Sequence, residues 1–221
     1  MIPKQPLSPK RRIMNSSDLF TELMQKELID FKKLPYWWPN YGKFEVILET
    51  ILTQQSKFEK VQQSISYLKK FNFLSIDTIL SAPQYQLASA IVPSGLYNQK
   101  ASRIIALMQN IKNDFNDFET FSKEVTREWL LAQKGIGSES ADAMLCYACK
   151  CEVMVIDNYT HKLLQSLDFT FESYEEMQNW IHEGIYPNLE TLLIKFPFIK
   201  DAHHLFAIFH GLIVEVGKRR A

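Results

Sequence analysis

The chain has 221 residues, of which 46% are hydrophobic and 13% aromatic, so it is long enough to bury a substantial core and too apolar to be disordered. Its 25 basic residues balance its 25 acidic ones, so its composition shows no general affinity for nucleic acid, and any DNA-binding face must be local. No apolar run reaches membrane-spanning length, and no signal-peptide core follows the basic start. We therefore expect a cytoplasmic protein that contacts no membrane.

The three cysteines lie in one short segment, as Cys146, Cys149 and Cys151. An odd number of thiols without distant partners does not resemble an extracellular disulfide framework, which favours a reducing compartment. Their spacing matches neither a zinc site nor an iron–sulfur cluster, and the histidines near the C-terminus form no convincing ligand set. We interpret the thiols as structural and predict no metal and no cofactor.

The first dozen residues contain three prolines and a basic cluster at residues 10–12. We interpret them as a flexible arm, more often solvated than bound to phosphate. Either Ser16 or Ser17 can cap a helix, and apolar residues at helical spacing continue it to about Phe31.

The stretch LPYWWPNY, residues 34–41, interrupts the helical pattern with two prolines and four aromatic residues. It therefore places Trp37 and Trp38 on a loop. Downstream, apolar residues recur at helical rather than alternating spacing, which predicts an all-α fold. The further predicted helices cover residues 44–52, 58–71, 75–81, 85–91, 98–112, 120–133, 138–149, 159–167, 174–183 and 201–219.

The turn between the helices near residues 120–133 and 138–149 reads Lys134-Gly135-Ile136-Gly137-Ser138. Its glycines permit positive φ and close backbone approach, which is typical of a hairpin between helices. The free amides that start the second helix can hold a phosphate oxygen, and Lys134 adds positive charge. Taken alone, an ordinary glycine cap is the more common explanation.

An apolar run at residues 153–156 leads to Asp157 directly before the next predicted helix. An Asp in this position is usually an N-cap. Capping also keeps the carboxylate ionised, so the structural and a chemical role are compatible.

Together these features resemble the endonuclease III superfamily of DNA glycosylases. The resemblance rests on the hairpin, Ala141 in the helix after it, and the run VIDNYTHKLL that contains Asp157, in this order and separation. Two further pieces agree: GLYNQKA at residues 95–101 and LTQQ at residues 52–55. The likeness covers roughly residues 35–168.

The resemblance implies a two-lobed, all-α glycosylase fold with a helix-hairpin-helix motif at about residues 124–150. One lobe would comprise six helices over residues 39–151, and the other would be built from residues 1–38 and 152–221. Double-stranded DNA would lie between the lobes, bound by a monomeric, bacterial protein. Lys57, Lys60, Lys100, Arg103 and Lys134 are available to phosphates.

In such enzymes a nucleotide is extruded from the duplex, because the glycosidic bond cannot be reached inside the stack. The resemblance implies that Asp157 faces the positive charge growing on the sugar, and orients or deprotonates water. Gln54 would fill the gap left by the extruded base. The hairpin residues Gly135, Gly137 and Ser138 would hold phosphate together with Lys134.

Relatives that also cut the DNA backbone carry a lysine at the second position after the hairpin, where this chain has Glu139. A carboxylate cannot form a Schiff base, so we expect a monofunctional enzyme that leaves an abasic site. Many relatives also hold an iron–sulfur cluster on four C-terminal cysteines, and this chain ends without cysteine.

The base pocket is suggested by WWPN at residues 37–40 and by the run from KFE at 43–45 through TQ at 53–54 to KFE at 57–59. These pieces resemble the bacterial 3-methyladenine glycosylases built on the endonuclease III scaffold. By that likeness the pocket is lined by Trp37, Trp38, Pro39 and Phe58, although such rings are also common in cores.

Aromatic rings attract a positively charged base, which favours alkylated purines, 3-methyladenine above all. Some relatives carry a lysine where Leu212 stands, so the resemblance does not identify the residue that forms the far wall of the pocket. Two alternatives are a non-catalytic helix-hairpin-helix DNA-binding module and a glycosylase for another damaged or mismatched base.

Overall fold

The computed structural model describes residues 13–220, which form helices and no strand. The all-α prediction is confirmed. The helices are α1 (Ser16–Met24), α2 (Glu45–Thr53), α3 (Phe58–Lys70), α4 (Ile76–Ser81), α5 (Gln84–Ala90), η1 (Val92–Ser94), α6 (Tyr97–Phe115), α7 (Phe118–Glu124), α8 (Arg127–Leu131), α9 (Ser138–Ala143), η2 (Met144–Ala148), α10 (Asn158–Gln165), α11 (Tyr174–Ile185), η3 (Tyr186–Asn188), α12 (Leu189–Lys195) and α13 (Ala202–Arg220).

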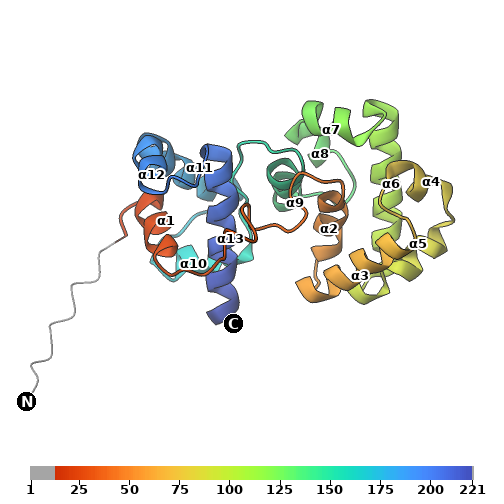
Figure 1. Cartoon of the computed structure of the whole chain (residues 1–221), viewed down its shortest axis with the longest axis horizontal. Helices are drawn as coiled ribbons and strands as arrows, with labels where there is room; N and C mark the ends of the chain where they lie inside the picture. The colour runs from red at the N-terminus through yellow and green to blue at the C-terminus, as the bar shows by residue number, and fades with distance from the viewer. Residues whose placement is uncertain (1–12, 221) are drawn as a thin grey trace, which may run out of the picture.

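Two separate clusters of buried apolar side chains organise these helices. The first cluster draws mainly on α2 to η2, and the second on α1 and on α10 to α13. Figure 1 shows the two groups of helices side by side, with α13 at the inner side of the second group. The sequence-based lobe boundaries at residues 38/39 and 151/152 stay a prediction.

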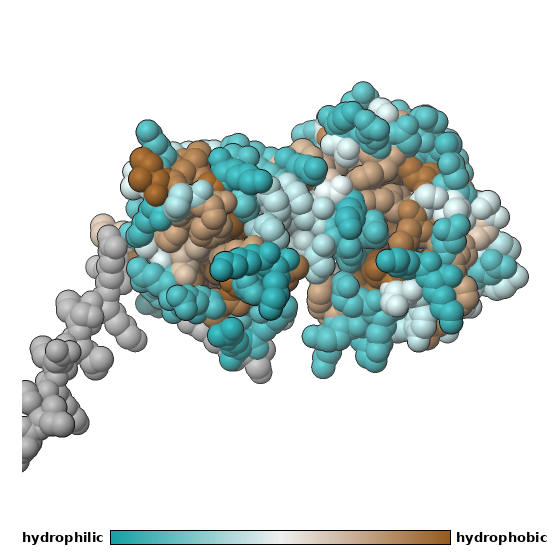
Figure 2. Space-filling model, in the orientation of Figure 1, coloured by the Kyte–Doolittle hydropathy of each residue, from teal (hydrophilic) through white to brown (hydrophobic). Residues whose placement is uncertain are grey.

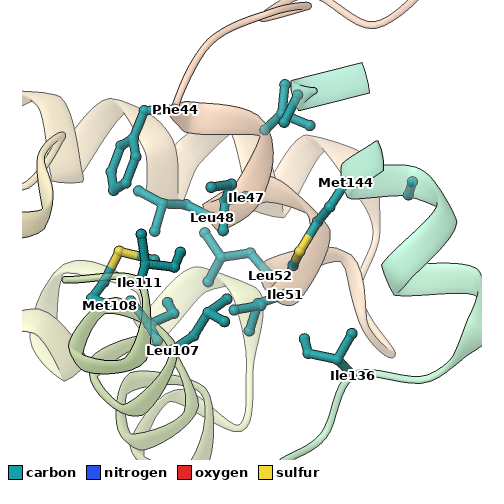
Figure 3. Packing of buried hydrophobic residues seen from close by; sticks show 14 of the residues in the cluster. Phe44, Ile47, Leu48, Ile51, Leu52, Leu107, Met108, Ile111, Ile136 and Met144 are labelled. Atoms are coloured by element: carbon teal, nitrogen blue, oxygen red, sulfur yellow. The ribbon is translucent and has the colours of Figure 1, made fainter. Parts of the chain in front are cut away.

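Helix α2 lies at the centre of the first cluster. Every residue from Val46 to Leu52 is buried, and the helix packs against α3, α6 and η2. Figure 3 shows Leu48 and Ile51 of α2 directed toward Leu107 and Ile111 of α6. A helix that is buried around its whole circumference must be surrounded by others, so α2 fixes the start of α3 and the loop between them.

The predicted first helix is too long in its second half. Helix α1 ends at Met24, and Glu27 adopts a left-handed φ of 48° that turns the chain. Leu28, Ile29 and Phe31 still pack on the second cluster from an irregular segment. The helical spacing of Leu28 and Phe31 therefore indicated buried positions and not helical backbone.

Two of the predicted helices are interrupted in the structure, and the observed helix α12 was not predicted. The predicted helix 120–133 is two helices, because Thr126 accepts a hydrogen bond from the Trp129 amide and starts α8 anew. The predicted helix 138–149 changes to a π-helical turn at Met144–Ala148. Helix α12 was missed in the stretch after Pro187. The basic arm predicted for residues 1–12 lies outside the described residues.

None of the helices within residues 13–220 is both long enough and apolar enough to cross a membrane.

Candidate functional site

Asp157 is the N-cap of α10. Its Oδ1 accepts hydrogen bonds from the Thr160 amide at 2.7 Å and from the Thr160 hydroxyl at 2.9 Å. The capping function expected for an Asp at this position is confirmed. One carboxylate oxygen is therefore committed to the helix, and the other remains for other partners.

The second oxygen, Oδ2, faces His210 of α13, whose Nε2 lies 3.6 Å away. The Asp157 side chain is only 12% exposed. Burial raises the pKa of Asp157, but the nearby His210 imidazole, together with the hydrogen bonds from Thr160, outweighs burial and holds that pKa below its usual value. Asp157 is thus a buried carboxylate that stays ionised at neutral pH.

The segment that leads to Asp157 is fixed by a buried carboxylate, that of Asp142 in α9. Its Oδ2 accepts hydrogen bonds from the Tyr174 hydroxyl at 2.7 Å and from Gln178 Nε2 at 2.9 Å. Tyr174 in turn accepts from the Ile156 amide at 3.2 Å, and Gln178 donates to the Met154 carbonyl at 2.7 Å. Residues 154–156 are therefore tied to α9 and α11 just before Asp157.

The aromatic residues of the predicted pocket gather beside this carboxylate. The Trp37 ring lies edge-on to His210, with centroids 5.3 Å apart, and perpendicular to Trp38 at 5.8 Å. Phe58, at the start of α3, is also perpendicular to Trp38, at 6.4 Å. The structure brings Trp37, Trp38 and Phe58 together, whereas Pro39 is exposed and none of the ring contacts involves it.

Trp38 is held by a second buried carboxylate, that of Glu49 in α2. Glu49 accepts hydrogen bonds from Trp38 Nε1, Asn40 Nδ2 and Gln62 Nε2. Burial nonetheless raises the pKa of Glu49, because these donors are neutral. Glu49 thus fixes the indole from the core side, an interaction that sequence reasoning missed.

Lys218 of α13 was also missed. Its Nζ lies 5.7 Å from the ring centroids of both Trp37 and Phe58 and forms an ion pair with Glu215 at 2.9 Å. Figure 2 shows a groove between the end of α13 and the start of α3, the two helices to which Lys218 and Phe58 belong. Leu212, in contrast, is buried in the second cluster.

Gly211, Glu215 and Lys218 recur at helical spacing. This pattern could have identified from the sequence the face of α13 that packs against Trp37. A Cβ at Gly211 would lie 2.4 Å from Trp37, so the glycine lets the indole pack directly on the helix. Glu215 accepts from Trp37 Nε1 at 3.2 Å.

The hairpin connects α8 to α9. Lys134, Gly135 and Gly137 are exposed and Ser138 is partly exposed, while Ile136 is buried and anchors the turn. Gln54, from the loop after α2, reaches this hairpin: its Nε2 donates to the Gly135 carbonyl at 3.0 Å and to Ser140 Oγ at 3.1 Å. The two predicted DNA-binding segments are therefore adjacent.

Glu139 is solvent-exposed and lies near Asp157, the candidate catalytic carboxylate. Partial desolvation of its carboxyl group raises the pKa of Glu139, and the negative charge of Asp157 raises it further. The charge of His210 acts in the opposite direction. Two carboxylates thus interact from α9 and from the start of α10.

Lys100 is not available to phosphate, contrary to the sequence-based expectation. It is buried, and its Nζ donates to the carbonyls of Leu52 at 2.7 Å and Ser94 at 2.8 Å. Burial lowers the pKa of Lys100 to about 8. The residue ties the end of α2 to η1.

The three thiols lie in and after the π-helical turn, with Cys146 fully buried. Burial raises the pKa of each thiol, which opposes the thiolate form that metals require.

The two hairpin glycines provide a matched pair of variants. Gly135 has a φ of +84°, and a Cβ there would lie 2.7 Å from Arg103 Nε, whereas a Cβ at Gly137 meets nothing within 4 Å. Gly135→Ala should lower the free energy of unfolding by about 1–2 kcal/mol. Gly137→Ala should change it by less than about 0.5 kcal/mol, because reduced unfolded-state entropy offsets the weaker cap.

Urea denaturation of both variants measures the difference. Equal stability of the two variants would contradict the left-handed hairpin geometry.

Comparison with known proteins places this geometry in a family. Residues 48–187 match the HhH-GPD superfamily of base excision DNA repair proteins. Among sequence relatives, a protein of Methanocaldococcus jannaschii named as a DNA repair glycosylase is 29% identical over 201 residues, covering 88% of this chain and 85% of the relative. Endonuclease III of Sulfolobus acidocaldarius is 30% identical over 171 residues, with coverages of 76% and 72%.

Among solved structures, 3-methyladenine DNA glycosylase (MagIII) of H. pylori, bound to 1,N6-ethenoadenine, superposes with a TM-score of 0.89. It is 43% identical, and the match covers 94% of this chain and 99% of that one. An endonuclease III–DNA complex shares the fold with a TM-score of 0.67 at 18% identity, covering 91% of this chain and 85% of that one. The chain belongs to the HhH-GPD superfamily of base excision DNA repair proteins.

Proposed function

We propose that this protein is a monofunctional DNA glycosylase that hydrolyses the N-glycosidic bond of alkylated purines, 3-methyladenine above all, and leaves an abasic site. The observation that carries the proposal is the arrangement of Asp157, Trp37 and Phe58. An ionised, buried carboxylate lies beside aromatic rings that already accommodate a cation, the Lys218 ammonium.

The choice of alkylated purines follows from charge. Alkylation at N3 or N7 of a purine nucleotide makes the base cationic and weakens its glycosidic bond, so the leaving group needs little protonation. Cation–π attraction then favours the damaged base over its neutral parent. The ion pair between Lys218 and Glu215 provides an anion to hold the ammonium when the base enters. The likeness to the H. pylori enzyme supports the same substrate class.

In the proposed reaction, a nucleotide extruded from the duplex places its sugar at Asp157. As the bond to the base breaks, positive charge grows on the sugar, and the carboxylate stabilises it in a low-dielectric site. Water adds to the sugar carbon and releases a proton, for which Asp157 Oδ2 is the available acceptor. Thr160 holds the other oxygen throughout.

We propose that duplex DNA lies across the groove between the two clusters, bound by a monomer. The hairpin amides and Lys134 would contact phosphate. Gln54 would exchange its bonds to Gly135 and Ser140 for contacts in the space vacated by the base. Arg103, which donates to Gln54 Oε1 at 2.8 Å, keeps the loop beside the hairpin before DNA arrives.

The two alternative functions, a non-catalytic DNA-binding module and a glycosylase for another base, predict different products. A non-catalytic DNA-binding module releases no base from methylated DNA and tolerates the loss of Asp157. A glycosylase for another damaged or mismatched base releases that base instead. Chromatography of the products from methylated DNA, and from DNA that carries other damaged or mismatched bases, distinguishes all three.

Asp157→Asn should abolish base release while preserving folding and DNA binding. The amide oxygen still caps α10, but the charge that faces the sugar is gone, so single-turnover release should fall at least about 100-fold. Asp117→Asn is the matched control, because Asp117 caps α7 in the same way with a 2.8 Å bond to the Thr120 amide, far from the site. Wild-type rates in Asp157→Asn would refute the catalytic role.

Phe58→Ala should slow release of 3-methyladenine by about tenfold, the cost of one lost cation–π contact. Phe71→Ala serves as its control, because Phe71 is an exposed ring at the other end of α3. Single-turnover rates on methylated DNA measure both. An unchanged rate in Phe58→Ala would remove this residue from the base pocket.

Borohydride should trap no covalent adduct between the protein and damaged DNA, because Glu139 cannot form an imine and Lys100 is buried in its bonds to backbone carbonyls. A lyase-competent relative treated in parallel is the positive control. A trapped adduct would show that another amine acts as nucleophile.

A further inference from the structure

His210 contains a buried polar atom without a hydrogen-bond partner. Its side chain is 5% exposed, and its Nε2 is directed at Asp157 Oδ2 from 3.6 Å. Buried polar atoms are almost always paired, so an unpaired one beside a carboxylate calls for a physical explanation.

The other ring nitrogen, Nδ1, is fixed by Tyr147. The Tyr147 hydroxyl lies 2.7 Å from His210 Nδ1 and 2.9 Å from the Ala207 carbonyl oxygen. A hydroxyl has one hydrogen, and a carbonyl can only accept. The hydroxyl therefore donates to Ala207, and Nδ1 must carry a proton in order to donate to the hydroxyl.

With Nδ1 protonated, two states of Nε2 remain. In the neutral ring a lone pair would face the carboxylate oxygen, which is repulsive and leaves the nitrogen unpaired. In the imidazolium form both nitrogens carry a hydrogen, and the positive charge faces Asp157. Only this second form replaces the repulsion at Nε2 by an attraction between opposite charges.

We propose that His210 is a positioning residue that carries this positive charge toward Asp157, and that Tyr147 holds its ring in the required orientation. The proposal rests on the proposed function for the part that Asp157 plays in catalysis. The 3.6 Å separation is longer than a hydrogen bond, so His210 supplies charge without occupying Oδ2, which stays available to the sugar and to water.

The charged and titratable groups around the imidazole agree with this assignment. Asp157 faces it from the start of α10, and Glu139 of α9 is close enough for the charge of His210 to lower the pKa of Glu139. Tyr147 approaches from η2, and on α13 itself the Glu215 carboxylate is paired with Lys218. The Trp37 ring packs edge-on against the imidazole and excludes water from it.

The consequence is that the pH dependence of base release changes when the imidazolium is removed. Without the imidazolium, burial of Asp157 is opposed only by the bonds from Thr160, so the pKa of Asp157 rises. Base release then needs a higher pH before the carboxylate ionises.

The test compares pH profiles of single-turnover base release. In His210→Gln the acid limb should shift upward by about one pH unit or more, with about a tenfold loss of rate at pH values on that limb. Tyr147→Phe removes the hydroxyl that orients the ring and should shift the acid limb in the same direction. The matched control is His161→Gln, because His161 is exposed on α10, one turn after Asp157. An unmoved acid limb in His210→Gln would overturn the proposal.

A second measurement needs no catalysis. Nitrogen-15 NMR of the wild-type protein without DNA should show both ring nitrogens of His210 protonated at pH 7, and carbon-13 NMR should show the Asp157 carboxyl titrating at higher pH in His210→Gln. A neutral His210 ring at pH 7 would overturn the proposal even if the variants do not fold. If the wild type releases no base from methylated DNA, the proposed function fails, and the NMR result still decides the His210 assignment.

Discussion

The buried carboxylate of Asp142 is the interaction on which the geometry of the site depends. It accepts hydrogen bonds from Arg127 in α8 and from Tyr174 and Gln178 in α11, so it joins the hairpin to the second cluster. The same two α11 side chains bind the backbone at residues 154–156. Because this segment has no sheet partner, these contacts satisfy its polar groups and fix where α10 begins. The Asp142 carboxylate and the side chains that donate to it therefore fix the position of Asp157 relative to the hairpin.

Three carboxylates are buried in or near the site, and their partners determine what each can do. Asp142 is paired with a guanidinium, and Glu49 is surrounded by neutral donors that leave its pKa raised. Asp157 combines a helix start with the charge of His210, which lowers its pKa despite burial. Only the last arrangement keeps a carboxylate ionised while one of its oxygens stays available. A structural carboxylate and a catalytic one therefore differ in their partners rather than in their burial.

Helical periodicity predicted most elements, and its errors have a common cause. Leu28 and Phe31 continue the helical spacing of Phe20 and Met24, yet a left-handed Glu27 ends the helix before them. Spacing reports which side chains are buried, whereas capping and φ angles decide where a helix ends. The π-helical turn at residues 144–148 had no periodic signal, although it carries Tyr147 to His210.

The sequence by itself determined the all-α fold, the order of hairpin and Asp157, and the proximity of Trp37, Trp38 and Phe58 implied by the family resemblance. These properties are carried by local patterns and short motifs within the chain. Only the tertiary structure decided that Lys100 is buried, that Lys218 rather than Leu212 faces the aromatic rings, and that Glu49 and His210 support Trp38 and Asp157. Those contacts join residues far apart in the chain, from 11 positions for Glu49 and Trp38 to 181 for Trp37 and Lys218. A hydrogen bond across such a separation depends on how helices pack, and no spacing in the sequence encodes it.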